Sequence, residues 1–201
     1  MDREYVLASG NQGKLREITG MLEPLGFVVR PQSDWQVPEA EETASTFVEN
    51  SLIKARQAAD YTGLPSIADD SGLVVPILNG DPGIYSARYA GESADSQANM
   101  RKLLAELKDR PEPDRGAYFY CAMVLVLSVD DPAPLIATGR WHGIILESPQ
   151  GDGGFGYDPI FYVPTHDCSG GELALDEKNK ISHRALALKA MLDEFKKHKF
   201  L

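Results

Sequence analysis

Two adjacent acids in the middle of the chain are the residues best suited to chemistry. The run Ser66-Ile67-Ala68-Asp69-Asp70-Ser71-Gly72 leads an apolar segment directly into Asp69 and Asp70. We predict that a buried strand ends at Ala68 and that the two carboxylates meet water there. Because neighbouring side chains on a strand point to opposite faces, one acid can face a cleft while the other turns toward backbone or solvent. Such a carboxylate suits a hard cation such as Mg²⁺ or the orientation of an attacking water, although the same run is also typical of a turn that only caps backbone groups.

A polar loop between the first predicted strand and the first predicted helix could bind an anion. Residues 5–8 form an apolar strand pattern, and apolar residues at helical spacing from Leu15 onward predict a helix that Gly26 ends. Backbone N–H groups, the positive helix end and a lysine would together attract an anion. The nucleotide-binding P-loop spacing is absent, and a plain turn with a solvated lysine is the alternative. The loop consists of Ser9, Gly10, Asn11, Gln12, Gly13 and Lys14.

The segment that precedes the two acids supplies further charged side chains. Residues 46–61 have the pattern of a helix on which Asn50 and Lys54 share a face. Lys54 could reach a phosphate, although an ordinary surface lysine is the simpler interpretation. The acidic cluster Glu39, Glu41 and Glu42 is either a solvated loop or the source of a metal ligand.

The second half of the chain combines strands with a glycine-dense loop. Residues 117–129 and 135–146 are rich in aromatic and β-branched residues and predict a long antiparallel hairpin. The run 151–159 holds closely spaced glycines, which suggests positive φ angles or close approach of the backbone to another group. Within it Phe155 and Tyr157 could offer a flat surface to a nucleobase, or simply anchor a tight loop.

The last predicted helix begins with an unusual charge pattern. Ser182 is suited to be its N-cap, and His183 and Arg184 then fall in the first turn. Cations there oppose the helix dipole, whose N-terminal end is positive, so an anionic or acceptor partner is indicated. The preceding residues 165–171 suggest only a flexible segment.

Composition limits the class of protein and the kind of partner. The 201 residues carry a net charge of -10, which argues against a broad grip on nucleic acid but not against one small polyanion. Two cysteines are too few for a disulfide framework, and no signal segment is recognised. No apolar run approaches the ~20 residues of a membrane span. We therefore expect a cytoplasmic protein without a membrane partner. The strand–helix order predicts an α/β fold, with a mixed elongated sheet flanked by helices and one domain over residues 1–201 whose two lobes surround a central substrate cleft.

Taken together, these motifs resemble the inosine triphosphate pyrophosphatase family, and within it the bacterial members that act on dITP and XTP. The resemblance runs from Leu7 to Met191, and six blocks in the expected order are far more specific than any one block. The blocks are Ser9-Gly10-Asn11-x-x-Lys14, Thr46-Phe47-x-Glu49-Asn50-x-x-x-Lys54-Ala55, Ala68-Asp69-Asp70-Ser71-Gly72, Pro82-Gly83-Ile84-Tyr85-Ser86-Ala87-Arg88, Gly154-Phe155-Gly156-Tyr157-Asp158-Pro159 and Ser182-His183-Arg184.

The resemblance implies a homodimeric, Mg²⁺-dependent hydrolase that converts dITP, ITP or XTP to the monophosphate and pyrophosphate and so removes deaminated purines from the nucleotide pool. It makes Asp70 the general base and a metal ligand, and Glu42 the second metal ligand. Residues 9–14 and Lys54 would hold the triphosphate, and Ser71 would contact the substrate. The residues implied in base recognition are Phe155, Gly156, Tyr157, Asp158, Lys178, His183 and Arg184.

Two other functions fit parts of the sequence. One is a nucleotide pyrophosphatase of different specificity, such as the septum-inhibitor-like group that acts on modified pyrimidines. The other is a nucleotide-sensing module without catalytic activity. The paired acids and the glutamate cluster argue against the sensing module, because a pure binder of a polyanion should avoid carboxylates unless a metal intervenes.

Overall fold

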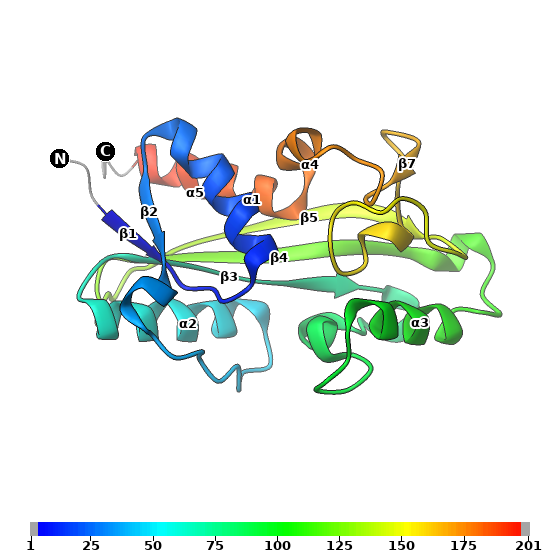
Figure 1. The fold of residues 1–201 in the computed structure, drawn as a ribbon, viewed down its shortest axis with the longest axis horizontal. Helices are drawn as coiled ribbons and strands as arrows, with labels where there is room; N and C mark the ends of the chain where they lie inside the picture. Colours follow the sequence, from blue (N-terminus) through cyan, green and yellow to red (C-terminus); the bar gives the residue numbers. More distant parts are fainter. Residues whose placement is uncertain (1–3, 198–201) are drawn as a thin grey trace. The chain divides into compact units, whose positions relative to one another are not determined.

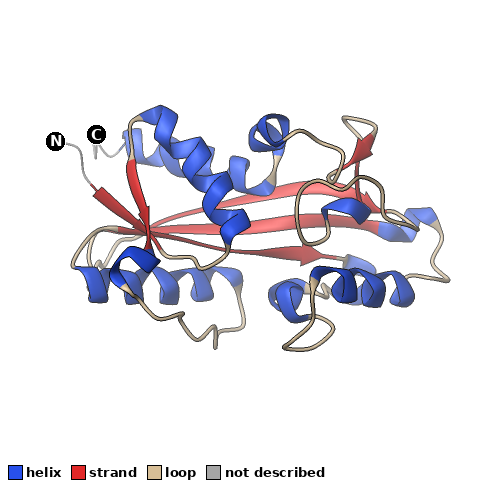
Figure 2. Cartoon of the chain, in the orientation of Figure 1, coloured by secondary structure: helices blue, strands red, loops and turns tan. Residues whose placement is uncertain are grey.

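The computed structural model describes residues 4–197, which form a mixed α/β fold. Its seven strands follow the order β2-β1-β3-β4-β5-β6-β7 in one sheet, with helices on both faces (Figures 1 and 2). β1 pairs in parallel with β2 and β3, whereas the β5–β6 and β6–β7 pairs are antiparallel, so the predicted mixed sheet is confirmed. The strands are β1 (Glu4–Leu7), β2 (Val28–Pro31), β3 (Ser66–Val74), β4 (Gly116–Val126), β5 (Leu135–Ile145), β6 (Phe161–Val163) and β7 (Cys168–Ser169).

Five α-helices and several short 3₁₀ helices accompany these strands within residues 4–197. The α-helices are α1 (Gln12–Leu22), α2 (Phe47–Thr62), α3 (Ser96–Glu106), α4 (Leu175–Ile181) and α5 (His183–Lys197). The 3₁₀ helices are η1 (Glu23–Leu25), η2 (Gln32–Trp35), η3 (Pro76–Leu78), η4 (Gly83–Arg88), η5 (Glu112–Arg115) and η6 (Asp158–Ile160).

The chain divides into two compact units, and β3, β4 and β5 each contribute residues to both. Unit 1 comprises Met1–Asp70, Cys121–Gly139 and His183–Leu201, and unit 2 comprises Ser71–Tyr120 and Arg140–Ser182. The prediction of a single domain with two lobes around a cleft stays a prediction.

In unit 1 the strands β1 and β3 are buried on both faces. Figure 1 shows α1 and α5 on one side of β1 and β3 and α2 on the other. Consecutive residues alternate between two apolar clusters: Leu7 and Ile67 pack with α1 and α5, whereas Val6 and Ala68 pack with α2. This alternation explains why the strand sequences read as continuous apolar runs. It also fixes the faces onto which the side chains that follow Ala68 must point.

Unit 2 has its own apolar core. Phe119, Trp141 and Phe161 lie in contact, with ring centroids 4.7 to 6.0 Å apart. Leu103 and Leu107, in α3 and at its C-terminal end, join the same cluster. Trp141, on β5, is therefore part of the core of unit 2.

The element boundaries confirm several predictions. Helix α2 begins after Thr46, whose hydroxyl accepts a hydrogen bond from the Glu49 N–H, and ends at Gly63 with φ of 68°. The two strands of the predicted hairpin, β4 and β5, are neighbours in the sheet.

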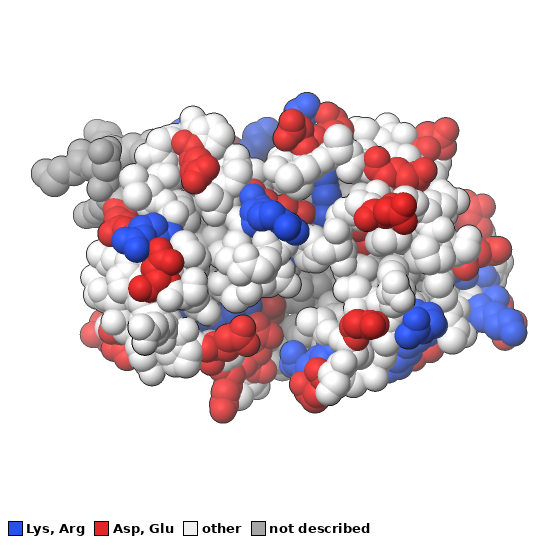
Figure 3. Space-filling view, viewed as in Figure 1, with Lys and Arg blue, Asp and Glu red and all other residues white. Residues whose placement is uncertain are grey.

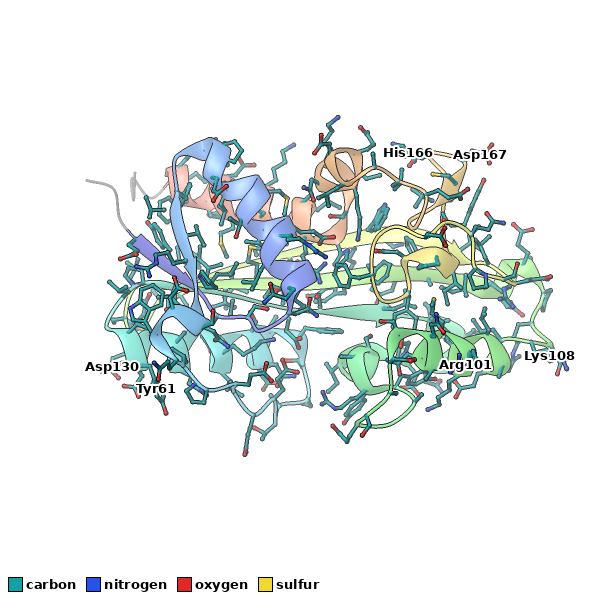
Figure 4. All side chains as sticks on the ribbon, viewed as in Figure 1. Tyr61, Arg101, Lys108, Asp130, His166 and Asp167 are labelled. Atoms are coloured by element: carbon teal, nitrogen blue, oxygen red, sulfur yellow. The ribbon has the colours of Figure 1, made fainter. Side chains whose placement is uncertain are left out.

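One predicted segment differs from the structure. It lies after β3, which ends at Val74 because Pro76 cannot donate to a strand ladder and begins η3. Residues 165–171, expected to be flexible, contain β7 and a turn that includes His166 and Asp167 (Figure 4). The Tyr162 hydroxyl donates to Asp167 at 2.6 Å. β7 has only two residues, so it shows no apolar period in the sequence.

Candidate active site

The loop after β1 leads directly into α1 through an asparagine cap. The Asn11 side chain accepts hydrogen bonds from the N–H groups of Gly13 at 2.9 Å and Lys14 at 3.2 Å. Gln12, Gly13 and Lys14 are therefore in the first helical turn rather than in a loop, which corrects the sequence interpretation. Since the cap already uses two backbone donors, they cannot also bind an anion while it is intact. An anion at this helix end would be held mainly by Lys14 and by groups outside the cap.

Asp69 and Asp70 lie inside β3, not at its end. The strand continues through both residues to Val74, and only 1% of Asp69 and 5% of Asp70 is exposed. The prediction that the strand meets water at this point was wrong, because four nearby cations and amides replace water around the carboxylates. The predicted alternation is confirmed: Asp69 points toward α1 and α5, and Asp70 points toward α2.

On the α2 side, two carboxylates converge on one ammonium group. Lys54 Nζ lies 2.7 Å from Glu42 Oε1 and 3.4 Å from Asp70 Oδ1. Asn50, one turn earlier on the same helix face, donates from Nδ2 to Asp70 Oδ2 at 3.4 Å. The shared face of Asn50 and Lys54, read from their spacing of four residues, thus delivers both side chains to Asp70.

Burial and charge oppose each other at this cluster. Burial raises the pKa of Asp70, and the positive charge of Lys54 only partly offsets that effect. Burial alone would lower the pKa of Lys54, but the charges of Asp70, Asp69 and Glu42 outweigh it, so its pKa is raised. Lys54 is consequently a stable cation here, and Asp70 accepts a proton more readily than an ordinary aspartate.

The pair Glu42 and Asp70 fits a magnesium ion held jointly by protein and substrate. Both carboxylates already point at one cation, the Lys54 ammonium. Within residues 4–197 no group of three or more His, Cys, Asp or Glu side chains could enclose a metal. Mg²⁺ does not need such a cage, since it usually takes one or two carboxylates together with substrate phosphates and water.

On the other face of β3, Asp69 lies in a buried network of four charges. Its Oδ2 atom is 3.2 Å from Lys14 Nζ and 3.2 Å from Arg184 Nε. Arg184 also donates from Nη1 to Glu17 Oε2 at 2.7 Å, and at most 3% of either side chain is exposed. The anionic partner expected for Arg184 at the start of α5 is therefore found within the protein. Glu17 was not predicted; its only signal in the sequence is its position one turn after Lys14.

The network strongly favours the ionised form of both central groups. Burial disfavours the charged form of Asp69, but Lys14 and then Arg184 outweigh it and hold its pKa well below the usual range. Burial likewise disfavours the Arg184 cation, but Asp69 and Glu17 outweigh it and raise the pKa of Arg184. Asp69 and Arg184 are thus both charged at neutral pH, as a buried ion pair requires.

In unit 2, Asp158 organises the glycine-dense loop. Its Oδ2 atom accepts hydrogen bonds from Phe155 N–H at 2.7 Å and from Lys178 Nζ at 2.6 Å. The Lys178 ammonium also lies 4.7 Å from the centroid of the Phe155 ring. Gly154 has φ of 70°, and a Cβ there would collide with the Asp158 carboxylate. The predicted positive φ is confirmed, and the loop conformation depends on this aspartate.

The other residues predicted to contact the substrate lie in different parts of the two units. Tyr157 lies in the core of unit 2 and donates from its hydroxyl to the Ser86 carbonyl at 2.9 Å. Gly156 has φ of 64°, and Ser71 is half-buried in β3. His183 is buried at the start of α5 in unit 1, where its carbonyl lies so close to Gly139 that a Cβ there would collide with it. The role of each of these residues toward a nucleobase stays a prediction.

Charge is scattered over the face of the molecule that Figure 3 shows. Figure 3 shows basic side chains as separate spots on the visible face, among acidic and uncharged ones. Among residues 4–197, no helix is long and apolar enough to cross a membrane.

Comparison with known proteins gives one consistent result. A model of the Ham1 family matches residues 5–194. The dITP/XTP pyrophosphatase of Vibrio cholerae is 53% identical over 189 residues, which are 94% of each protein, and that of Escherichia coli strain K12 is 51% identical over 95% of this chain and 97% of the relative. A solved HAM1 protein from Coxiella burnetii is 48% identical, with a TM-score of 0.89 and coverage of 97% of this chain and 99% of that one. A solved protein from Mycobacterium abscessus, described as a nucleoside-triphosphatase and dITP/XTP pyrophosphatase, is 43% identical with a TM-score of 0.74, over 94% and 98% of the two chains.

Proposed function

Because this chain belongs to the Ham1 family, we propose that it hydrolyses the triphosphates of deaminated purines, dITP, ITP and XTP, to the monophosphate and pyrophosphate. The relatives named dITP/XTP pyrophosphatase support this substrate class, since they cover nearly the whole chain. The observation in the structure that carries the proposal is the convergence of Glu42 and Asp70 on one cation beside α2.

We assign the phosphate chemistry to residues of unit 1. Glu42 and Asp70 would hold Mg²⁺, which neutralises phosphate charge and lowers the pKa of bound water. Lys14 and Lys54 supply positive charge for the triphosphate and for the pyrophosphate that leaves. Asp70 is the general base, and the effect of burial on its pKa supports that role, because a base works best when its pKa approaches the working pH.

The proposed reaction is a single displacement at the α-phosphorus. The water oxygen attacks phosphorus while its proton passes to the Asp70 carboxylate. The bond between the α-phosphorus and the bridging oxygen breaks, and pyrophosphate leaves with the bonding electrons. Lys14 stabilises that negative charge electrostatically and needs no proton transfer to do so.

We propose that base selectivity depends on hydrogen bonds to the 6-oxo group. Hypoxanthine and xanthine present an acceptor where adenine presents an amino donor, so cationic or N–H donors would accept the former and mispair with the latter. Such a site can reject a mismatched base by ~10^4 or more. In unit 2, Lys178 and the Phe155 N–H are hydrogen-bond donors. In unit 1, Arg184 is a donor, and we propose His183 as a further one from the family resemblance.

Product analysis tests the proposal. ITP, XTP, ATP and GTP are each incubated with the protein and Mg²⁺, and orthophosphate is resolved from pyrophosphate. IMP or XMP with pyrophosphate, and little product from ATP, is the expected result. A nucleoside diphosphate with orthophosphate would overturn the mechanism. Turnover of modified pyrimidine triphosphates but not ITP would indicate the other pyrophosphatase group, and tight ITP binding without turnover would indicate a sensor.

Two properties of the assembly and environment remain part of the proposal. We propose a homodimer in the cytoplasm, on the basis of the family resemblance. Sedimentation equilibrium of the purified protein would show twice the 22.0 kDa chain mass if the dimer forms.

A further inference from the structure

The buried network around Asp69 joins residues to which the proposed function gives different tasks. Lys14 on α1 is assigned to the phosphates, and Arg184 on α5 is assigned to the base. A single carboxylate oxygen, Asp69 Oδ2, lies 3.2 Å from a nitrogen of each. The Lys14 ammonium also lies 3.5 Å from the backbone carbonyl of Asp69, so both of its contacts here are to one residue of β3.

From this geometry we propose that Asp69 is a positioning residue that holds Lys14 and Arg184 in place for the substrate. This inference rests on the proposed function, because it takes its meaning from the task given to Lys14. It assigns to Asp69 a role different from that of Asp70, although the two acids are adjacent in the sequence.

The first argument is the face of the strand. Asp69 follows Ile67 by two residues and therefore shares its face, which packs against α1 and α5. Asp70 shares the face of Ala68, on which Lys54 and Glu42 lie. The pleat of β3 thus separates a carboxylate for the metal from a carboxylate for the two cations.

The second argument is conformational freedom. A lysine side chain has four rotatable bonds and loses ~2 kcal/mol of rotamer entropy when it is fixed. In the free protein, Asp69 already restricts Lys14, whose side chain is only 13% exposed. The Lys14 side chain has therefore already lost most of this entropy during folding, and binding of a substrate phosphate need not order it again. This is the general advantage of a preorganised site.

The third argument is the contact of Arg184 with a second acid, Glu17. Glu17 lies one turn after Lys14 on α1 and is 2.7 Å from Arg184 Nη1. Arg184 is therefore fixed from two sides, by β3 and by α1, whereas Lys14 contacts the carboxylate and the backbone carbonyl of Asp69. Loss of the Asp69 charge should consequently affect Lys14 more than Arg184.

The test uses the two products of the reaction as separate probes. Binding of pyrophosphate with Mg²⁺ reports on Lys14, and binding of IMP reports on the base side; both are measured by calorimetry and need no turnover. For Asp69→Asn we expect pyrophosphate affinity to fall by about tenfold, which is ~1.4 kcal/mol. In a Lys14→Ala background the same substitution should have almost no further effect, since the charge then has no lysine to hold.

Three further measurements separate positioning from other roles. Binding of Mn²⁺ to the free protein should change less than about twofold in Asp69→Asn but fall strongly in Asp70→Asn, because only Asp70 is assigned to the metal. Asp34→Asn is the matched control: it removes the same charge and an exposed ion pair with Arg30 in unit 1, and should leave pyrophosphate affinity unchanged. Glu17→Gln should weaken IMP binding more than pyrophosphate binding.

Several outcomes would overturn the inference. Tighter pyrophosphate binding in Asp69→Asn would mean that the carboxylate competes with phosphate for Lys14. Equal losses with and without Lys14 would indicate a general structural role, and loss of Mn²⁺ binding would indicate a metal ligand. If Asp69→Asn does not fold, an unchanged ratio of IMP to pyrophosphate affinity in Glu17→Gln would count against the network. Failure of the proposed function would instead be visible in the wild-type protein, as the absence of IMP and pyrophosphate from ITP.

Discussion

Replacing Lys54 by methionine should tighten metal binding to the free protein and, at the same time, weaken triphosphate binding. The Lys54 ammonium lies between Glu42 and Asp70, the two acids assigned to Mg²⁺. A divalent cation entering this position must displace the ammonium, which then becomes available to a phosphate. Methionine has a similar length and no charge, so the substitution removes the competing cation with little change in shape.

The size of the effect follows from the contact distances and the burial. Two unit charges 4 Å apart attract by ~4 kcal/mol at an effective dielectric constant of ~20. Lys54 Nζ is 2.7 Å and 3.4 Å from the two carboxylates, whose side chains are 26% and 7% exposed. Much of this attraction offsets the desolvation of the charged groups. If about one third remains, ~1.4 kcal/mol, metal affinity should rise about tenfold on removal of the lysine.

The assay is a titration of Mn²⁺ into nucleotide-free protein, followed by calorimetry or electron paramagnetic resonance. Thermal unfolding in chelator gives a second readout: Lys54→Met should unfold at a lower temperature than wild type, because Glu42 and Asp70 then repel each other, and Mg²⁺ should restore part of the loss. Lys197→Met is the matched control, since it removes an exposed lysine paired with Glu194 in the same unit. Unchanged or weaker Mn²⁺ binding would refute the reasoning, because it would mean that the ammonium holds the acids in place for the metal.

Three more predictions concern single groups of unit 1. Asp70→Asn should abolish turnover of ITP while the unfolding transition in chelator is retained, and near-normal kcat would contradict its role as base. Lys14→Ala should weaken binding of the triphosphate far more than of the monophosphate; equal losses would exclude the phosphate contact. In metal-free protein, the stability lost by Asp69→Asn should shrink as the pH falls below ~3.8, the pKa of an ordinary aspartate. Burial disfavours the charged form of Asp69, but Lys14 and Arg184 outweigh it and lower the pKa of Asp69 in the folded protein. The stabilisation by this carboxylate is therefore present above ~3.8 and is lost as the pH falls toward the folded pKa. Urea unfolding of both proteins at several pH values measures this, and a difference in stability that does not change with pH would refute it.

Local patterns in the sequence were sufficient for much of the fold. The pattern over residues 46–61 predicted a helix, and α2 spans Phe47–Thr62. Residues 5–8 and 117–129 were predicted to be strands, and β1 (Glu4–Leu7) and β4 (Gly116–Val126) occupy most of these positions. Each of these features is decided within about one turn or one strand of sequence, which is the range over which propensity and capping act.

The errors arise where contacts distant in the sequence decide. Asp69 and Asp70 continue a buried strand only because Lys14, Lys54 and Arg184, from three different helices, neutralise them. From the local sequence alone, two adjacent acids are predicted to be exposed to solvent, because burial of an unpaired charge costs too much free energy. For the same reason Glu17 passed unnoticed: its function depends on Arg184, 167 residues away along the chain.

Under the proposed function, the charge balance of unit 1 predicts that the protein binds a triphosphate only together with a divalent cation. The two clusters on either side of β3 contain the cations Lys14, Lys54 and Arg184, and the carboxylates Glu17, Glu42, Asp69 and Asp70. In the free protein these groups carry one net negative charge and would not attract a triphosphate. A bound divalent cation makes the sum positive by one and also frees Lys54 from the two acids that it contacts. With the proposed metal site, the carboxylates would therefore make triphosphate binding conditional on a metal, whereas a cluster of lysines alone would bind any phosphate, with or without the ion that the proposed hydrolysis needs.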